Sequence, residues 1–142
     1  MINKMESEIL KNELVEIRNL DSTKSLLLIV EHAGNLIPSY MNELGLSAAD
    51  RKRHISYDIG IREVADYLVT SIDLTSILSR YSRLVVDLNR TANSRECVIE
   101  KSDGTDILGN IGLTSDARAS RIAKYHTPFH QPIKSIISKK NP

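Results

Sequence analysis

Short apolar runs alternate with amphipathic segments along the chain. Residues 26–30 and 84–88 are short and apolar, which is typical of strands buried on both faces of a sheet, and 76–78 indicate a weaker strand. Apolar residues recur at helical spacing over 61–72, so this segment is predicted to be an amphipathic helix. Strands separated by a helix in this way favour an α/β fold with a mostly parallel sheet.

Further helices are predicted toward both ends of the chain. Residues 1–20 carry apolar residues at near-helical spacing. Ser47 suits the N-cap of a short helix, with Asp50 at the position of the capping-box acid. A last helix begins at 114 or 115, and Pro128 is expected to kink or restart it because proline lacks the amide proton.

Composition narrows the class of protein. The 142 residues, 41% hydrophobic and 26% charged, are enough for one globular domain. Lysine and arginine number 19 against 18 acids, so we expect neither a nucleic-acid nor a membrane partner. The longest apolar run, 26–30, is too short to span a bilayer. The single cysteine, Cys97, excludes an internal disulfide and favours a reducing compartment, so we expect a cytoplasmic protein without a secretory signal.

His32 is the first residue of chemical interest. It follows the strand 26–30 beside small residues, a position that suits a metal ligand or an acid–base group. The alternative is a loop histidine bonded to a carbonyl. Asp58 can be a second metal ligand, or it can cap the helix that begins at 61.

Two further groups of polar residues invite a functional interpretation. Asn89 and Arg90 follow the run 84–88, where an arginine can grip a carboxylate with two bonds. The alternative is that Arg90 pairs with Asp87 or caps a loop and binds nothing. His126 and His130 are four residues apart, hence on one face of a helix, and can bind a metal, although a proline lies between them.

Five motifs occur in the order and with the spacing of the N-formylglutamate amidohydrolase family, which the chain resembles from about residue 26 to about residue 137. They are Glu31-His32-Ala33-Gly34-Asn35-Leu36-Ile37-Pro38, His54-Ile55-Ser56-Tyr57-Asp58-Ile59-Gly60, Arg80-Tyr81-Ser82-Arg83-Leu84-Val85-Val86-Asp87-Leu88-Asn89-Arg90, Ser102-Asp103-Gly104-Thr105 and Tyr125-His126-Thr127-Pro128-Phe129-His130.

The resemblance implies a fold and an activity. The family is related to zinc carboxypeptidases and aspartoacylases, so we expect a three-layer α/β/α sandwich around a mostly parallel or mixed sheet, of the phosphorylase/hydrolase-like type. The expected activity is zinc-dependent hydrolysis of N-formyl-L-glutamate, or a similar N-acyl amino acid, to formate and glutamate in histidine degradation.

The resemblance also assigns residues. His32 matches the first metal histidine of the family. Asn35 stands where carboxypeptidases have a glutamate ligand, and since asparagine is a poor zinc ligand, Asp58 is the expected second ligand. Asn89 and Arg90 are expected to hold the substrate carboxylate, as the corresponding pair does in aspartoacylases.

Family members are about twice as long as this chain, so we expect residues 1–142 to form a single truncated domain without the later half of the family. In carboxypeptidases that half brings a further metal histidine and the catalytic glutamate, so no catalytic base is identified here unless His126 or His130 substitutes. One alternative is an inactive homologue that binds an acidic metabolite or a partner chain through Asn89 and Arg90. Another is an interaction domain, in which a second copy or a partner chain completes the sheet.

Overall fold

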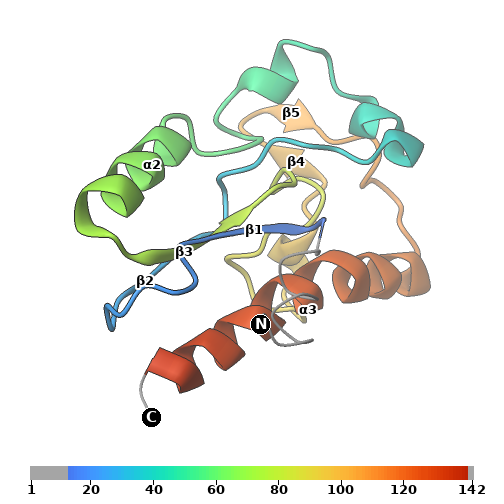
Figure 1. Ribbon diagram of the computed structural model, residues 1–142. Helices are drawn as coiled ribbons and strands as arrows, with labels where there is room; N and C mark the ends of the chain where they lie inside the picture. Colours follow the sequence, from blue (N-terminus) through green and yellow to red (C-terminus); the bar gives the residue numbers. More distant parts are fainter. Residues whose placement is uncertain (1–12, 141–142) are drawn as a thin grey trace.

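The computed structural model describes residues 13–140, which fold around a small sheet (Figure 1). Within these residues the sheet comprises β1 (Val15–Arg18), β2 (Leu27–Val30) and β3 (Thr75–Ser79). β3 lies in the middle, antiparallel to β1 and parallel to β2. The strands predicted at 26–30 and 76–78 are therefore confirmed, and the chain has the expected α/β class with a mixed sheet.

The two faces of the sheet carry different apolar residues, because side chains alternate along a strand. Ile29 of β2 packs with the main core cluster, which includes residues of α3 (Ser115–Lys140). Val30, the next residue, belongs to a smaller cluster with α2 (Ile61–Ile72). α2 and α3 accordingly lie on opposite faces of the sheet (Figure 1).

The predicted amphipathic helix is confirmed as α2, which joins β2 to β3. Gly60 precedes it with a φ of 85°, a left-handed conformation that glycine adopts without a steric cost. Two ion pairs then tie the helix to the edge strand β1: Asp66 pairs with Arg18, and Arg62 Nη1 donates to Glu16 Oε2 at 2.8 Å.

The segment 84–88 is buried, but the prediction that it forms a strand is wrong. Its backbone makes turns, in which the N–H of Val85 donates to Ser82 O at 3.0 Å and the N–H of Arg90 donates to Asp87 O at 3.2 Å. Its apolar side chains pack in the main core. Burial without strand pairing therefore explains the apolar run.

The helix predicted within residues 1–20 is wrong over 15–18, where the chain forms β1. Val15 pairs with Ser79, and Ile17 pairs with Ile77 of β3. Pairing with another strand thus overrides the near-helical spacing, as tertiary context often does. The rest of this prediction, at residues 1–12, lies outside the described residues.

α3 begins where predicted, with Thr114 Oγ1 accepting a hydrogen bond from the N–H of Ala117 at 3.1 Å. The helix continues through Pro128 and Pro132, so the restart expected at Pro128 does not occur. An interior proline costs a helix about 3 kcal/mol or more. Burial of the apolar face around Phe129, which is fully buried in the core, offsets that cost.

Short elements complete the described part of the chain: η1 (Ser39–Gly45), η2 (Asp50–Lys52), η3 (Arg95–Cys97), β4 (Lys101–Ser102) and β5 (Thr105–Asp106). The short helix predicted to begin at Ser47 is η2, and Ser47 Oγ accepts a hydrogen bond from the N–H of Asp50 at 3.0 Å. Among residues 13–140, none of the helices has the length and apolar character to cross a membrane.

Candidate active site

The loops that follow the parallel strands β2 and β3 lie against each other. A Cβ atom at Gly34 would be 2.1 Å from the carbonyl carbon of Arg80, so only glycine allows this approach. The N–H of Gly34 donates to Ser79 Oγ at 3.1 Å, and the N–H of Leu36 donates to Arg80 O at 3.1 Å. These contacts place both loops at the carboxyl edge of the strands, where α/β folds bind their ligands.

His32 lies in this region between two carboxylates. Its side chain is buried, with Nε2 at 2.7 Å from Asp87 Oδ1 and Nδ1 at 3.4 Å from Asp58 Oδ2. The N–H of Asp58 also donates to His32 O at 3.0 Å. The structure therefore brings together three of the residues that the sequence indicated, although they come from three separate loops.

Asp87 is the most strongly held member of this group. Its Oδ2 accepts a hydrogen bond from Arg83 Nη2 at 2.8 Å, and its Oδ1 accepts one from the N–H of Asn89 at 3.0 Å. Burial alone would raise the pKa of Asp87, but the hydrogen bond and charge of His32, the charge of Arg83 and the N–H of Asn89 outweigh it and lower this pKa to about 2. Asp87 is thus a carboxylate at neutral pH.

Sequence reasoning missed Arg83. Its Nη1 also lies 3.5 Å from Asp58 Oδ1, so one guanidinium faces both carboxylates that flank the histidine. The signal was the four-residue spacing between Arg83 and Asp87, which places the two side chains together in a turn. The strand predicted for this segment hides that signal, because residues four apart do not meet along a strand.

A pocket of about 460 Å³ opens beside Asp58. Its polar lining includes Asn35, Arg62, Glu63 and Arg80. The side-chain amide of Asn35 already has a partner within the protein, because its Nδ2 donates to Arg51 O at 2.6 Å. The pocket therefore combines carboxylates and guanidinium groups, and Asp58 connects it to the buried histidine.

Asn89 and Arg90 are exposed and do not line this pocket. Arg90 Nε lies 3.2 Å from Glu96 Oε2, and both side chains are largely accessible. The alternative partner considered for Arg90, Asp87, is instead paired with Arg83. Arg90 is therefore an accessible cation on the loop next to the His32 group.

His126 and His130 share one face of α3, as their spacing predicted, with ring centroids 4.4 Å apart. Each ring donates to a backbone carbonyl: His126 Nε2 to Arg90 O at 2.8 Å and His130 Nε2 to Leu88 O at 2.9 Å. Burial lowers the pKa of His130, and the neighbouring His126 lowers it further. These two histidines hold the loop that carries Asn89.

The arrangement of the histidine and acidic side chains can be compared with the ligands that a zinc ion requires. Among residues 13–140, no group of three or more histidine, cysteine, aspartate or glutamate side chains is arranged to hold a metal ion. The separation of 3.4 Å between His32 Nδ1 and Asp58 Oδ2 is long for a hydrogen bond. It matches the roughly 3.4 Å between two ligand atoms that each lie about 2.0–2.1 Å from a tetrahedral zinc ion. His32 and Asp58 thus fit two positions of a zinc site.

Comparison with known proteins places the chain in a family. It matches the family model of N-formylglutamate amidohydrolase over residues 24–141. It is also similar to the crystal structure of gene product Atu2144 from Agrobacterium tumefaciens, with a TM-score of 0.87 and 34% sequence identity. That similarity covers 91% of this chain and 51% of the other, so this chain spans about half the length of that protein. No curated protein matches it. Since the family model covers most of its residues, the chain belongs to the N-formylglutamate amidohydrolase family.

Proposed function

We propose that this chain forms the metal-binding and substrate-binding side of an amidohydrolase that releases formate from N-formyl-L-glutamate or a similar N-acyl amino acid. One observation carries the proposal: Nδ1 of His32 faces Asp58 at the pocket, while Nε2 is held by Asp87. Membership of the family supports hydrolysis as the reaction class.

Asp87 determines which nitrogen of His32 is available. A carboxylate only accepts hydrogen bonds, so the proton of a neutral His32 lies on Nε2, toward Asp87. Nδ1 then carries its lone pair on the side of Asp58. A histidine that donates to a carboxylate through one nitrogen and ligates through the other is the usual arrangement at zinc sites.

Zinc is the metal proposed here, with His32 and Asp58 as two ligands. When bound, it supplies Lewis acidity, which polarises a carbonyl and lowers the pKa of water to about 7. A catalytic zinc takes three protein ligands. We propose that the third ligand and the general base come from outside residues 13–140, because those residues offer no group of three ligands.

A longer chain or a partner chain would supply the third zinc ligand and the general base next to the sheet. β2 has one strand neighbour within the described residues, so its other edge can pair with a further strand. In this proposal α2, the extended sheet and α3 are the three layers of the family's sandwich.

Two groups are proposed to anchor the substrate carboxylates. Asn89 and Arg90 remain the pair that the family motif suggests, on the loop beside Asp87. Arg80 is a second anchor, because it lines the pocket beside Asp58 and forms no ion pair within the described part of the chain. A free guanidinium can bind a carboxylate with two parallel hydrogen bonds.

Binding without hydrolysis is the second candidate function. The lack of a three-ligand group within residues 13–140 favours it for this chain by itself. The same pocket would then hold an acidic metabolite against Arg80 without breaking its amide bond.

Zinc titration combined with a formate-release assay tests the proposal. We expect His32→Ala and Asp58→Asn to weaken zinc binding by tenfold or more, while His54→Ala, at an exposed histidine, leaves it unchanged. Formate release from N-formyl-L-glutamate by this chain should be slow, because loss of a general base costs ~10²–10⁴-fold in rate. Melting curves without zinc establish that each variant is folded.

The outcomes separate the two candidate functions. Equal zinc affinity in the wild-type chain and in folded His32→Ala would overturn the metal site. Formate release near an ordinary enzymatic rate of about 10 per second would contradict an external base. Saturable binding of N-formyl-L-glutamate that Arg80→Gln weakens, with no formate released, would establish the binding function instead.

A further inference from the structure

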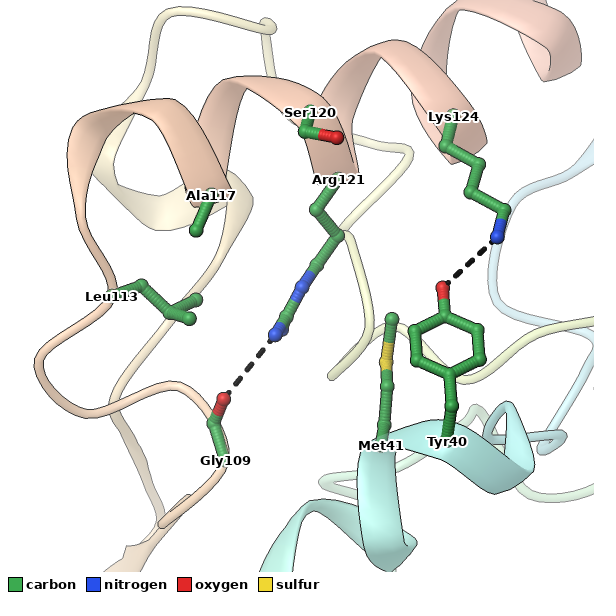
Figure 2. Close-up of a pocket in the computed structure, with 8 residues that line it drawn as sticks. All are labelled: Tyr40, Met41, Gly109, Leu113, Ala117, Ser120, Arg121 and Lys124. Carbon is green, nitrogen blue, oxygen red and sulfur yellow. Dashed lines mark hydrogen bonds between the residues drawn. The ribbon is translucent and has the colours of Figure 1, made fainter.

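A second pocket, of about 550 Å³, lies between the first half of α3 and η1 (Figure 2). α3 contributes Ser120, Arg121 and Lys124, and η1 contributes Tyr40 and Met41. Figure 2 shows the long side chains of Arg121 and Lys124 extending from the helix toward the opposite wall. The pocket shares no lining residue with the one beside Asp58, so the proposed amidohydrolase site does not use it.

The charged side chains that line this pocket are all positive. Arg121 and Lys124 both line it, and none of its lining residues is acidic. Within residues 13–140 neither cation has a carboxylate partner, whereas Arg83 and Arg53 each face two. Arg121 instead donates to the carbonyl of Gly109 at 3.2 Å and to the side-chain oxygen of Asn110. Two positive charges therefore face one cavity, and the described part of the chain places no carboxylate against them.

Both cations keep donors for a ligand. Arg121 carries five N–H groups, of which two serve the loop at 109–110. Lys124 Nζ donates to Tyr40 Oη at 3.2 Å and lies 4.7 Å from the centre of that ring, which leaves two of its three protons. The exposed hydroxyl of Ser120 lines the same cavity.

The walls are already fixed in position. The N–H of Gly109 donates to Leu44 O at 2.9 Å, and a Cβ at Gly109 would lie 2.8 Å from Leu44 Cα. The hydroxyl of Tyr40 is 2.5 Å from that of Tyr125, a buried residue of α3. Because these contacts join η1, the loop and α3, little ordering is needed when a ligand binds.

We propose that this pocket binds a small organic anion. Its carboxylate or phosphate group would contact Lys124 and the free N–H groups of Arg121. Its apolar part would lie on Met41 and Leu113, which line the same cavity. Binding here is independent of the proposed hydrolysis.

Amide chemical shifts in the full 142-residue chain test this site, with benzoate and inorganic phosphate as probes at low salt. We expect saturable shifts at Gly109, Ser120 and Lys124. Lys124→Gln should weaken the better probe by tenfold or more. Lys134→Gln, at an exposed lysine further along the same helix, is the matched control and should leave the affinity unchanged.

The arms of the experiment distinguish the ligand classes and the sites. Stronger binding of benzoate indicates a ligand with a carboxylate, and stronger binding of inorganic phosphate indicates a ligand with a phosphate group. Arg121→Gln, which removes the other cation of the pocket, provides a second variant with weakened binding if Lys124→Gln fails to fold. Saturation by neither probe, or equal weakening by Lys124→Gln and Lys134→Gln, overturns the proposal. N-formyl-L-glutamate should shift the amide signals of residues near Gly34 in the Lys124→Gln variant as in the wild type. Loss of binding at this pocket can therefore be distinguished from loss of binding at the pocket beside Asp58.

Discussion

Histidines occur in two contrasting environments in this molecule. The ring of His32 lies between the carboxylates of Asp58 and Asp87, with a guanidinium facing both acids. The rings of His126 and His130 lie next to each other on α3, and each donates to a backbone carbonyl. His32 is buried and the other two histidines are partly buried, but the sharper difference lies in their hydrogen-bond partners.

The difference in partners implies a difference in role. A backbone carbonyl accepts one hydrogen bond from the ring and carries no charge, so the bonds of His126 and His130 fasten a loop to a helix. A carboxylate fixes the tautomer of the ring and adds charge, and in the proposed function this leaves the second nitrogen of His32 for a metal. Both environments were suggested as metal sites by sequence; among residues 13–140 neither forms a group of three metal ligands, and only His32 has carboxylates beside its ring.

Replacing Asp87 by asparagine should have the largest effect on stability. The substitution leaves Arg83 and His32 without the buried carboxylate that they share. Removing one member of a buried ionic group costs about 3–5 kcal/mol. Urea unfolding at pH 7 measures the loss, and Asp116→Asn, at an exposed position on α3, is the control. A loss below about 1 kcal/mol would mean that the group around His32 resembles a surface ion pair.

Lowering the pH should have the second-largest effect on stability, because it neutralises the Asp87 carboxylate. The folded-state pKa of Asp87 lies at about 2, below its ordinary value of 3.8, so the unfolded chain takes up this proton first as the pH falls. The stabilisation is complete above the unfolded pKa and is lost as the pH falls through the folded-state pKa; it amounts to roughly 2–3 kcal/mol.

The difference in unfolding free energy between the wild type and Asp87→Asn, measured from pH 6 to pH 2, isolates this contribution from other carboxylates. The difference should shrink steadily below pH 4. If this difference does not change with pH, the charge of Asp87 does not contribute to the free energy of unfolding.

Much of this arrangement was readable in the sequence. The strand 26–30 and the helix 61–72 were correct, because each has a clear apolar pattern with only one favourable interpretation. His32 was placed at a strand end by the same pattern, whereas Asp87 lies within the apolar run 84–88. That run was buried without being a strand, so the contact from Arg83 to Asp87 could not be foreseen. Contacts between distant loops depend on packing that no local pattern contains.

His130→Ala should have a smaller effect than Asp87→Asn. It removes a hydrogen bond to Leu88 O and an edge-to-face contact with Phe129, whose ring centre is 5.3 Å away. Together these predict a loss of about 1–2 kcal/mol. Zinc affinity, measured by titration, should remain within about twofold, a difference of about 0.4 kcal/mol. Loss of zinc binding in the folded variant would place His130 in the metal site and would remove the contrast between the two environments.

Arg90→Lys should change stability least. The ion pair with Glu96 is exposed on both sides, and such pairs contribute about 0–1 kcal/mol. The bond from His126 reaches the backbone carbonyl of Arg90, which the substitution leaves in place. We therefore expect the melting temperature to stay nearly unchanged.

The informative measurement for Arg90 is ligand affinity. If it holds a substrate carboxylate, Arg90→Lys should weaken N-formyl-L-glutamate binding by tenfold or more, equivalent to about 1.4 kcal/mol, because an ammonium cannot form the paired bonds of a guanidinium. Glu96→Gln, which releases Arg90 from its present partner, should strengthen binding. A lower melting temperature with unchanged affinity would instead make Arg90 a residue of the loop. The carboxylate contact would then rest on Arg80, and Arg80→Lys should show the tenfold loss in its place.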